Sequence, residues 1–460
     1  MRSSIRSARH AARSVAAIAA VSALTLTACG SGDDGSGTGG GGGGDGESSL
    51  ELPDLSGRQL EVAAVWTGAE QDNFMAAVAE FEDRTGADVT FVPTGDNVAT
   101  FVGQKIAGGS PPDVVLLPQV GVLHEFAGKG WLAPVGELAM EQLDANYGDG
   151  WKNLGAHDGQ QYGVYIKAAN KSLIWYNTAP FETAGVSVPE TWDDFVSTAT
   201  TVSDSGTPPV SVGGADGWTL TDWFENIYLS QAGPEMYDRL AAHEIPWTDQ
   251  SVTEALTTLA ELFGRPSLLA GGTDGALRTD FPNSVTKVFS DLENPEAAMV
   301  YEGDFVGTVI TDSTDAVIGE DAQVFPFPAV GAEAPVVSGG DVAVAISESG
   351  EADEAQQALL AFFASTDAAA VWAERGGFIS PNRSLDPEVY PDDVQRTMAE
   401  ALIEAGDDFR FDLSDQTPAA FGGTTGQGMW QGLQDFLRNP ADVEGTQEYL
   451  ESQAASAYGE

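Results

Sequence analysis

Residues 60–92 read LEVAAVWTGAEQDNFMAAVAEFEDRTGADVTFV, and they predict a strand, a helix and a second strand. The run 60–66 is typical of a buried strand, and 89–92 repeats that pattern. Between them, apolar residues from Phe74 to Phe81 recur at the spacing of one helix face, and Gly86 can end the helix. At this spacing the crossover is right-handed, so the sequence predicts an α/β fold with parallel strands.

The same alternation continues along the chain. A helix over 98–106 precedes a strand at 114–117, and a second α/β unit begins with the strand 173–176. Thr191 is placed to cap a helix that starts at Trp192. Later elements include strands at 209–212, 298–301 and 342–346, and a helix after Ser251 whose pairing with Glu254 predicts a capping box.

Composition limits the classes of partner. Beyond residue 28 the chain has 16 Lys and Arg against 70 Asp and Glu, a formal net charge of −54. Nucleic-acid binding is disfavoured because phosphates need basic partners, and an anionic membrane surface is disfavoured for the same reason. About 410 residues exceed the size at which one core usually keeps growing, so we expect two lobes.

The N-terminus reads as a secretion signal. Four arginines precede a short apolar run, Val15 to Leu26, and small residues lead to Cys29, the only cysteine. Leu-Thr-Ala-Cys resembles the lipobox of bacterial lipoproteins, which implies lipidation at Cys29 after removal of residues 1–28. Residues 30–49 are Gly-, Ser- and Asp-rich and predict a flexible tether over 29–49. The expected location is the extracellular face of the cytoplasmic membrane.

Catalytic and metal motifs are mostly missing from the sequence. No nucleophile elbow, zincin helix or phosphate loop appears, and His124-Glu125 lacks the second histidine that a zincin needs. We therefore expect no enzyme activity, no cofactor and no metal. What remains at predicted strand-to-helix turns is a set of aromatic rings with carboxylates and amides, which suits a polyhydroxylated ligand.

One segment carries a family resemblance. Tyr162 to Asn177, YGVYIKAANKSLIWYN, resembles the first passage between lobes in the extracellular solute-binding proteins of ABC importers. Further segments follow in the family's order: PPD at 111–113, VPETWDDF at 188–195, SGGDVAVAI at 338–346 and GGFISPN at 376–382. Tyr165 stands where the family usually has proline. The likeness is greatest to the sugar-binding, maltose-binding-protein-like group, and within it to α-glucoside binders.

The resemblance implies a periplasmic-binding-protein-like fold. Each of two lobes would carry a central, mostly parallel sheet flanked by helices, and three hinge crossings would join them. The N-terminal lobe would comprise 50–168 plus 341–377, and the C-terminal lobe 169–340 plus 378–460. The protein, expected to be a monomer, would bind a sugar between the lobes and deliver it to membrane permease subunits.

The expected ligand-binding residues lie at predicted turns and crossings. They are Trp66, Glu70, Gln119, Lys167, Asn170, Trp218, Asp222, Glu302, Asp304, Phe305, Gly340, Asp341, Arg375 and Phe378. Two alternatives stay open. The first is the same fold binding a polyamine, polyol, peptide or other small solute, since the acidic residues suit a cation. The second is an anchored glycosidase, which needs two carboxylates facing each other across the cleft.

Overall fold

The computed structural model describes residues 50–347 and 349–459. The predicted signal peptide, Cys29 and the predicted tether lie outside the described residues. The larger sheet has six strands: β1 (Gln59–Ala64), β2 (Asp88–Pro93), β3 (Val114–Leu117), β6 (Gly163–Asn170), β11 (Val337–Ala345) and β12 (Arg410–Phe411). The second sheet has four strands in the order β10 (Ala322–Pro326), β7 (Leu173–Asn177), β9 (Met299–Tyr301) and β8 (Val210–Ser211). A small pair comprises β4 (Ala156–His157) and β5 (Gln160–Gln161).

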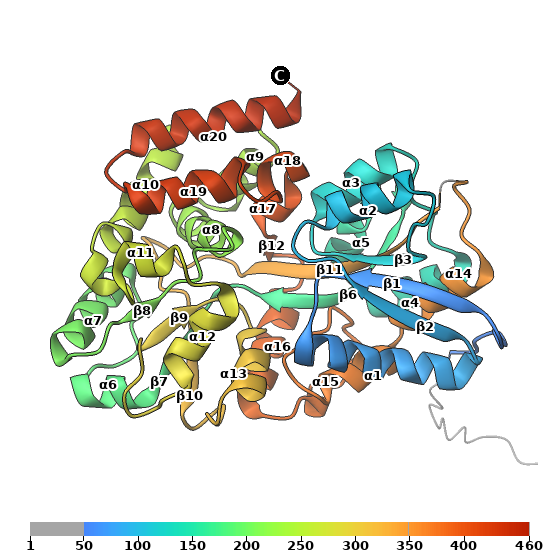
Figure 1. Cartoon of the computed structure of the whole chain (residues 1–460), viewed down its shortest axis with the longest axis horizontal. Helices are drawn as coiled ribbons and strands as arrows, with labels where there is room; N and C mark the ends of the chain where they lie inside the picture. The colour runs from blue at the N-terminus through green and yellow to red at the C-terminus, as the bar shows by residue number, and fades with distance from the viewer. Residues whose placement is uncertain (1–49, 348, 460) are drawn as a thin grey trace, which may run out of the picture. The chain divides into compact units, whose positions relative to one another are not determined.

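Helices surround both sheets (Figure 1). The first fifteen are α1 (Gly68–Thr85), α2 (Val98–Ala107), α3 (Val120–Gly128), α4 (Glu137–Asn146), α5 (Asp149–Leu154), α6 (Thr178–Ala184), α7 (Trp192–Ser205), α8 (Trp218–Ala232), α9 (Pro234–Ala241), α10 (Gln250–Phe263), α11 (Gly272–Ala276), α12 (Phe281–Phe289), α13 (Val306–Ser313), α14 (Glu354–Phe363) and α15 (Thr366–Ala373). The later ones are α16 (Asp393–Ala405), α17 (Leu413–Gln416), α18 (Ala419–Gly422), α19 (Gly428–Arg438) and α20 (Val443–Tyr458), and two 3₁₀ turns are η1 (Pro266–Leu268) and η2 (Pro387–Val389).

The opening strand, helix and strand form as the sequence predicts. β1 pairs in parallel with both β2 and β3. The face of α1 from Phe74 to Phe81 is buried, because it covers the sheet. Gly86 adopts the left-handed conformation with φ 74° and ends α1 by donating its N–H to the carbonyl of Glu82. Periodicity and crossover handedness therefore predict the three parallel strands of the larger sheet, beside which β11 runs antiparallel to β3.

The second sheet departs from the expected parallel arrangement. β7 is antiparallel to both β9 and β10, and only β8 and β9 run in parallel. The expectation rested on short strand–helix–strand spacing. Here β8 and β9 are separated by several helices, and β7 pairs with strands far along the chain. Connections of that length impose no strand direction.

Strands β6 and β11 link the two sheets (Figure 1). They pair with each other antiparallel from Ser338 opposite Asn170 to Val344 opposite Gly163. β6 continues directly into β7, which lies in the four-stranded sheet. Gly340 permits the close pairing, because a Cβ atom there would lie 2.6 Å from the carbonyl oxygen of Lys167. The chain therefore passes between the lobes on a paired ribbon.

The helix caps are partly as expected. Thr191 caps α7, since its Oγ1 accepts a hydrogen bond from the N–H of Asp194 at 3.2 Å. The capping box at Ser251 was wrong. α10 begins at Gln250, and its cap is Asp249, two residues before Ser251; the Asp249 carboxylate accepts from the N–H of Ser251 at 2.9 Å. Asp caps a helix as well as Ser does, so the residue type alone did not determine whether Asp249 or Ser251 is the N-cap of α10.

The apolar residues form two cores. One is built around the six-stranded sheet and includes side chains of α16 and β12, and the other is built around α8, α10, α19 and α20. Aromatic rings contribute to both: Trp151 stacks on Phe409 in the first, and Phe224 packs against Trp247 in the second. None of the helices in the described part of the chain has the length and apolar content of a membrane-spanning segment.

Candidate functional site

A cavity of about 570 Å³, here called the central cleft, is lined by elements of both lobes. Its walls come from the segments that follow β1 and β3, from β6 and β11, and from the starts of α1, α8 and α12. Ligand sites in α/β sheets lie beyond the carboxyl ends of the strands, which is where Trp66 and Gln119 stand. The position of the cleft therefore matches the strand-end rule.

Eight of the expected residues line the central cleft: Trp66, Glu70, Gln119, Lys167, Trp218, Phe305, Gly340 and Asp341. They come from six separate segments of the chain. Gln119 is almost fully buried, and its Oε1 has no hydrogen-bond partner among the described residues. Such an acceptor gains a partner if a ligand hydroxyl donates to it.

Six expected residues do not line the cleft: Asn170, Asp222, Glu302, Asp304, Arg375 and Phe378. The N–H of Asn170 donates to Asp304 Oδ1 at 2.7 Å, so both shape the turn after β6. Arg375 is exposed and donates to Asn73 at 2.8 Å. Phe378 stacks behind the cleft on Trp372, with ring centroids 4.7 Å apart.

Lys167 forms the charged centre of the cleft. It is 4 % exposed, and its Nζ forms an ion pair with Glu70. Asp341 lies directly opposite Lys167 in the β6–β11 pairing. Burial would lower the pKa of Lys167, but Glu70 and Asp341 raise it above its ordinary value, so the side chain is an ammonium. Burial raises the pKa of Asp341 to about 6, although Lys167 opposes that shift.

Lys171 forms a second charged cluster behind Trp218. Its Nζ lies 2.5 Å from Asp412 and 3.3 Å from Asp222, and Asp415 stands at 3.8 Å. These carboxylates raise the pKa of Lys171 well above its ordinary value, against the opposing effect of burial. Burial raises the pKa of Asp222 to about 7. Asp222 was expected to touch ligand, but it is fully buried and acts as a counterion.

Glu302 belongs to the same buried cluster. Its two carboxyl oxygens have no hydrogen-bond donor among the described residues. Burial and the neighbouring Asp222 carboxylate raise the pKa of Glu302 well above its ordinary value, so it is held as the acid. A protonated carboxyl can donate to Asp222, and this pairing removes Glu302 from the cleft.

One group of carboxylates in the described residues is close enough to hold a metal ion: Asp222, Glu225 and Asp412. Their oxygens already have partners. Lys171 is the cation beside Asp222 and Asp412, and Glu225 accepts from the N–H groups of Leu413 and Ser414 at 2.8 and 3.1 Å. The Lys171 ammonium and the first N–H groups of α17 therefore already pair with the carboxylates that a metal ion would need.

Three aromatic rings pack against one another at tilted angles in the lining of the cleft. Phe281 lies 5.4 Å from Trp218 and 5.3 Å from Phe305, and Trp218 lies 6.1 Å from Phe305, measured between ring centroids. Gly217 precedes Trp218 with φ 87°, which places the indole at the start of α8. Phe281 was not expected from the sequence. Its signal was available, because Asp280 caps α12 and aromatic residues at such turns were already candidates.

Carboxylates that the sequence analysis did not select also line the cleft. Asp96, Asp216 and Asp280 are among them, together with Asp312 and Asp415. Burial raises the pKa of Asp216 to about 6, and the charges of Asp96 and Asp280 add to the shift. Asp96 follows β2, so the strand-end rule would have selected it.

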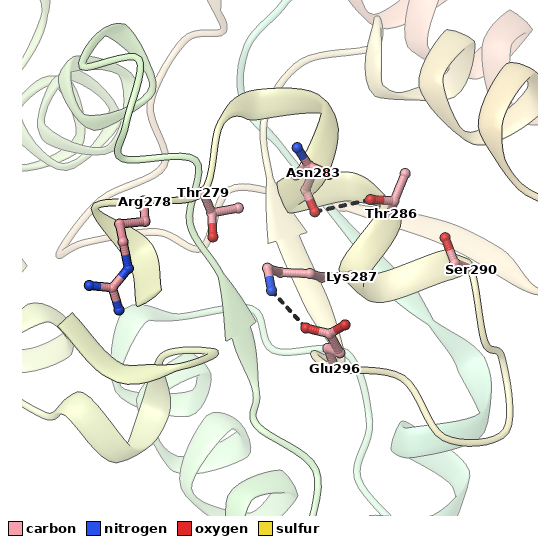
Figure 2. A pocket seen from close by; sticks show the side chains of 7 residues that line it. All are labelled: Arg278, Thr279, Asn283, Thr286, Lys287, Ser290 and Glu296. Carbon is pink, nitrogen blue, oxygen red and sulfur yellow. Dashed lines mark hydrogen bonds and ion pairs between the residues drawn. The ribbon is translucent and has the colours of Figure 1, made fainter. Parts of the chain in front are cut away.

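A smaller hollow of about 330 Å³ lies beside α12 (Figure 2). Its lining is polar, and two of its charged groups, Lys287 and Glu296, pair with each other. Lys287 donates to Glu296 at 2.7 Å, and Thr286 donates to the carbonyl of Asn283 at 3.2 Å. It has no aromatic ring in its lining, so the central cleft is the better candidate site.

Two lobes joined by a strand ribbon, with a cleft lined from both, define a two-lobed α/β solute-binding protein. Residues 67–370 match the family model described as bacterial extracellular solute-binding protein. The chain belongs to this family.

Two relatives are similar over nearly their whole length. The osmoprotective compounds-binding protein GgtB of Synechocystis sp. is 33 % identical over 411 residues, covering 87 % of this chain and 94 % of the relative. The alpha-glucosides-binding periplasmic protein AglE of Rhizobium meliloti is 30 % identical over 407 residues, covering 85 % and 86 %. Both are named as binding proteins, consistent with the expectation that this chain is not an enzyme.

Solved structures show the same fold. The bacterial solute receptor AcbH has a TM-score of 0.72 and 21 % identity, covering 86 % of this chain and 98 % of that one. Maltose-bound MalE3 of T. maritima has a TM-score of 0.68 and 16 % identity, covering 86 % and 99 %. The expected two-lobed α/β fold is confirmed by these likenesses, which at such identity concern the fold alone.

Proposed function

We propose that the protein captures a neutral saccharide, an α-glucoside or a small oligosaccharide, in the central cleft and delivers it to the permease of an ABC importer. The observation that carries the proposal is the cluster of Trp218, Phe281 and Phe305 rings in the cleft lining, which also contains the Glu70 and Asp341 carboxylates. A ring covers the C–H face of a sugar, and carboxylates accept from its hydroxyls. The cleft volume lies within the roughly 300–1,000 Å³ of small-molecule sites.

The name of one of the two relatives supports an α-glucoside. One is named for osmoprotective compounds and the other for α-glucosides. The lobes proposed for this chain keep the boundaries 50–168 plus 341–377 and 169–340 plus 378–460. Closure would be a hinge motion about the β6–β11 ribbon, driven by contacts that the ligand makes only in the closed state. The protein acts as a monomer in this proposal.

Calorimetry with a panel of α-glucosides and disaccharides tests the ligand class. We expect saturable binding by the wild type and a loss of roughly tenfold or more in Trp218→Ala, because about 60 Å² of apolar ligand surface would lose its cover at about 25 cal/mol per Å². Trp131→Ala is the matched control. Trp131 is also half-buried, packs on Phe126 and faces a lysine, Lys129, but lies outside the cleft.

A cationic solute is the second candidate, because Asp96, Asp216 and Asp280 line the cleft. Putrescine and choline therefore belong in the same panel. Binding of a cation by the wild type, with no response to any saccharide, would reject the sugar proposal and retain the binding-protein fold.

Cys29 is proposed as the lipid attachment site that holds the protein at the outer face of the membrane. The serine variant Cys29→Ser should appear in the soluble fraction with unchanged ligand affinity. Retention in the membrane fraction would reject the anchor.

A further inference from the structure

The aromatic rings around Lys167 are arranged as a cage for a cation. Lys167 Nζ lies 5.6 Å from the ring centroid of Trp66, 5.7 Å from that of Phe305 and 5.9 Å from that of Trp372. Trp66 and Trp372 meet edge to face with centroids 5.0 Å apart, which fixes the two indoles relative to each other. A cation within about 6 Å of a ring centroid is attracted by the ring quadrupole. The Lys167 ammonium of the chain itself already occupies this cage.

The carboxylates of this cage are engaged in the same way. Glu70 forms an ion pair with Lys167, and Asp341 lies opposite Lys167 on the neighbouring strand. Both line the central cleft. Three rings and two carboxylates are the set that would hold a quaternary ammonium ion, and Lys167 supplies the positive charge instead.

A second indole of the cleft, that of Trp218, also faces a lysine of the chain. Lys171 Nζ lies 5.6 Å from the ring centroid of Trp218, and it is held by Asp222 and Asp412. A cationic ligand on Trp66 or Trp218 would therefore stand beside a resident ammonium, and charges of like sign repel. A neutral ligand meets no such repulsion, and the Lys167 ammonium keeps donors for its hydroxyls, since an ammonium has three N–H groups.

We propose that Lys167 is the specificity-determining residue that excludes cationic solutes from the central cleft and restricts it to uncharged ones. This assignment rests on the proposed function and names the feature that separates its two candidate ligand classes. It predicts that removal of the lysine charge converts the cage into a cation site, because Glu70 and Asp341 lose their ammonium and stand beside Trp66 and Phe305, the two rings of the cage that line the cleft.

The test compares Lys167→Met with Lys167→Arg by calorimetry with choline. Methionine keeps a long apolar side chain and removes the charge, whereas arginine keeps the charge. We expect Lys167→Met to bind choline roughly tenfold or more tightly than the wild type, and Lys167→Arg to behave as the wild type does. Lys129→Met is the control, because Lys129 also pairs with a carboxylate, Glu125, and faces a ring, Trp131, outside the cleft.

Thermal unfolding of each variant establishes that it is folded before it is titrated. A folded Lys167→Met that gains no choline affinity overturns the proposal, and so does a Lys167→Arg that gains as much as Lys167→Met. The saccharide panel is read separately. If the wild type binds no saccharide, the sugar proposal fails, while the choline comparison still decides the role of Lys167.

Discussion

Replacing Asp304 by asparagine should reduce the loss of stability that the protein shows as pH rises. Asp304 is buried next to the cleft, where Oδ1 accepts from the N–H of Asn170 at 2.7 Å and Oδ2 has no partner among the described residues. Burial raises its pKa from 3.8 to about 7, although Lys167 opposes the shift. Between these values the folded state keeps a proton that the unfolded chain has released.

The sign of the effect follows from this difference. Because the folded state binds more protons, the free energy of unfolding falls as pH rises from about 4 to beyond 7. Between pH 5 and pH 8 this one carboxyl removes about 2–3 kcal/mol of stability. Asparagine does not titrate. Its oxygen can still accept from Asn170, but its amide N–H groups lack an acceptor, which costs about 1–3 kcal/mol at every pH.

Urea unfolding at pH 5, 6, 7 and 8 and constant ionic strength measures this directly. Asp304→Asn should be less stable than the wild type at pH 5, and the difference should shrink or reverse by pH 8. Asp72→Asn, the same change at an exposed position of α1, should show no such trend. A stability difference between Asp304→Asn and the wild type that stays constant from pH 5 to pH 8 would refute the reasoning.

Three further substitutions have expected outcomes for stability. Lys171→Met should lower the free energy of unfolding by about 3–5 kcal/mol, because Asp222 and Asp412 lose their buried counterion, and the loss should be smaller in acid, where carboxylates are protonated. Gly340→Ala should cost about 1–3 kcal/mol in chemical unfolding, since its Cβ would meet the Lys167 carbonyl, whereas Gly103→Ala, with open space around it in α2, should cost nothing. Thr191→Ala should cost about 1 kcal/mol through loss of the α7 cap, and Thr201→Ala within the same helix should not. An equal effect for either pair would contradict the cap and close-contact arguments.

Local patterns predicted the first sheet well and the second sheet less well. β1, α1, β2 and β3 lie close together in sequence, so apolar periodicity and crossover handedness were sufficient. β7 meets β9 and β10 across more than a hundred residues, and no local pattern encodes the direction of such a pairing. The strand-end rule located the cleft because it depends on the ends of β1 and β3, two strands that these local patterns had predicted.

Only part of the candidate site could be predicted from the sequence, because a position in a turn does not determine where the side chain points. Trp218 and Asp222 are one helical turn apart on α8, yet the indole lines the cleft and the carboxylate is buried beneath it. The sequence spacing places both side chains on one face of α8, but it does not tell how deeply each side chain is buried. Lys171 was not among the expected site residues, since its partners come from α8 and from the cap of α17, far apart in the chain.

The position of β11 in the larger sheet has a consequence for synthesis. Val342 in β11 pairs with Leu117 in β3, so about 225 residues must be made before that edge of β3 can be covered. At about 5–20 residues per second, the ribosome needs roughly 10–45 seconds to reach it. During that interval β3 lacks its β11 neighbour, so the larger sheet cannot be completed. The ribosome must therefore translate the whole second sheet, β7 to β10, before the first sheet can close on β11.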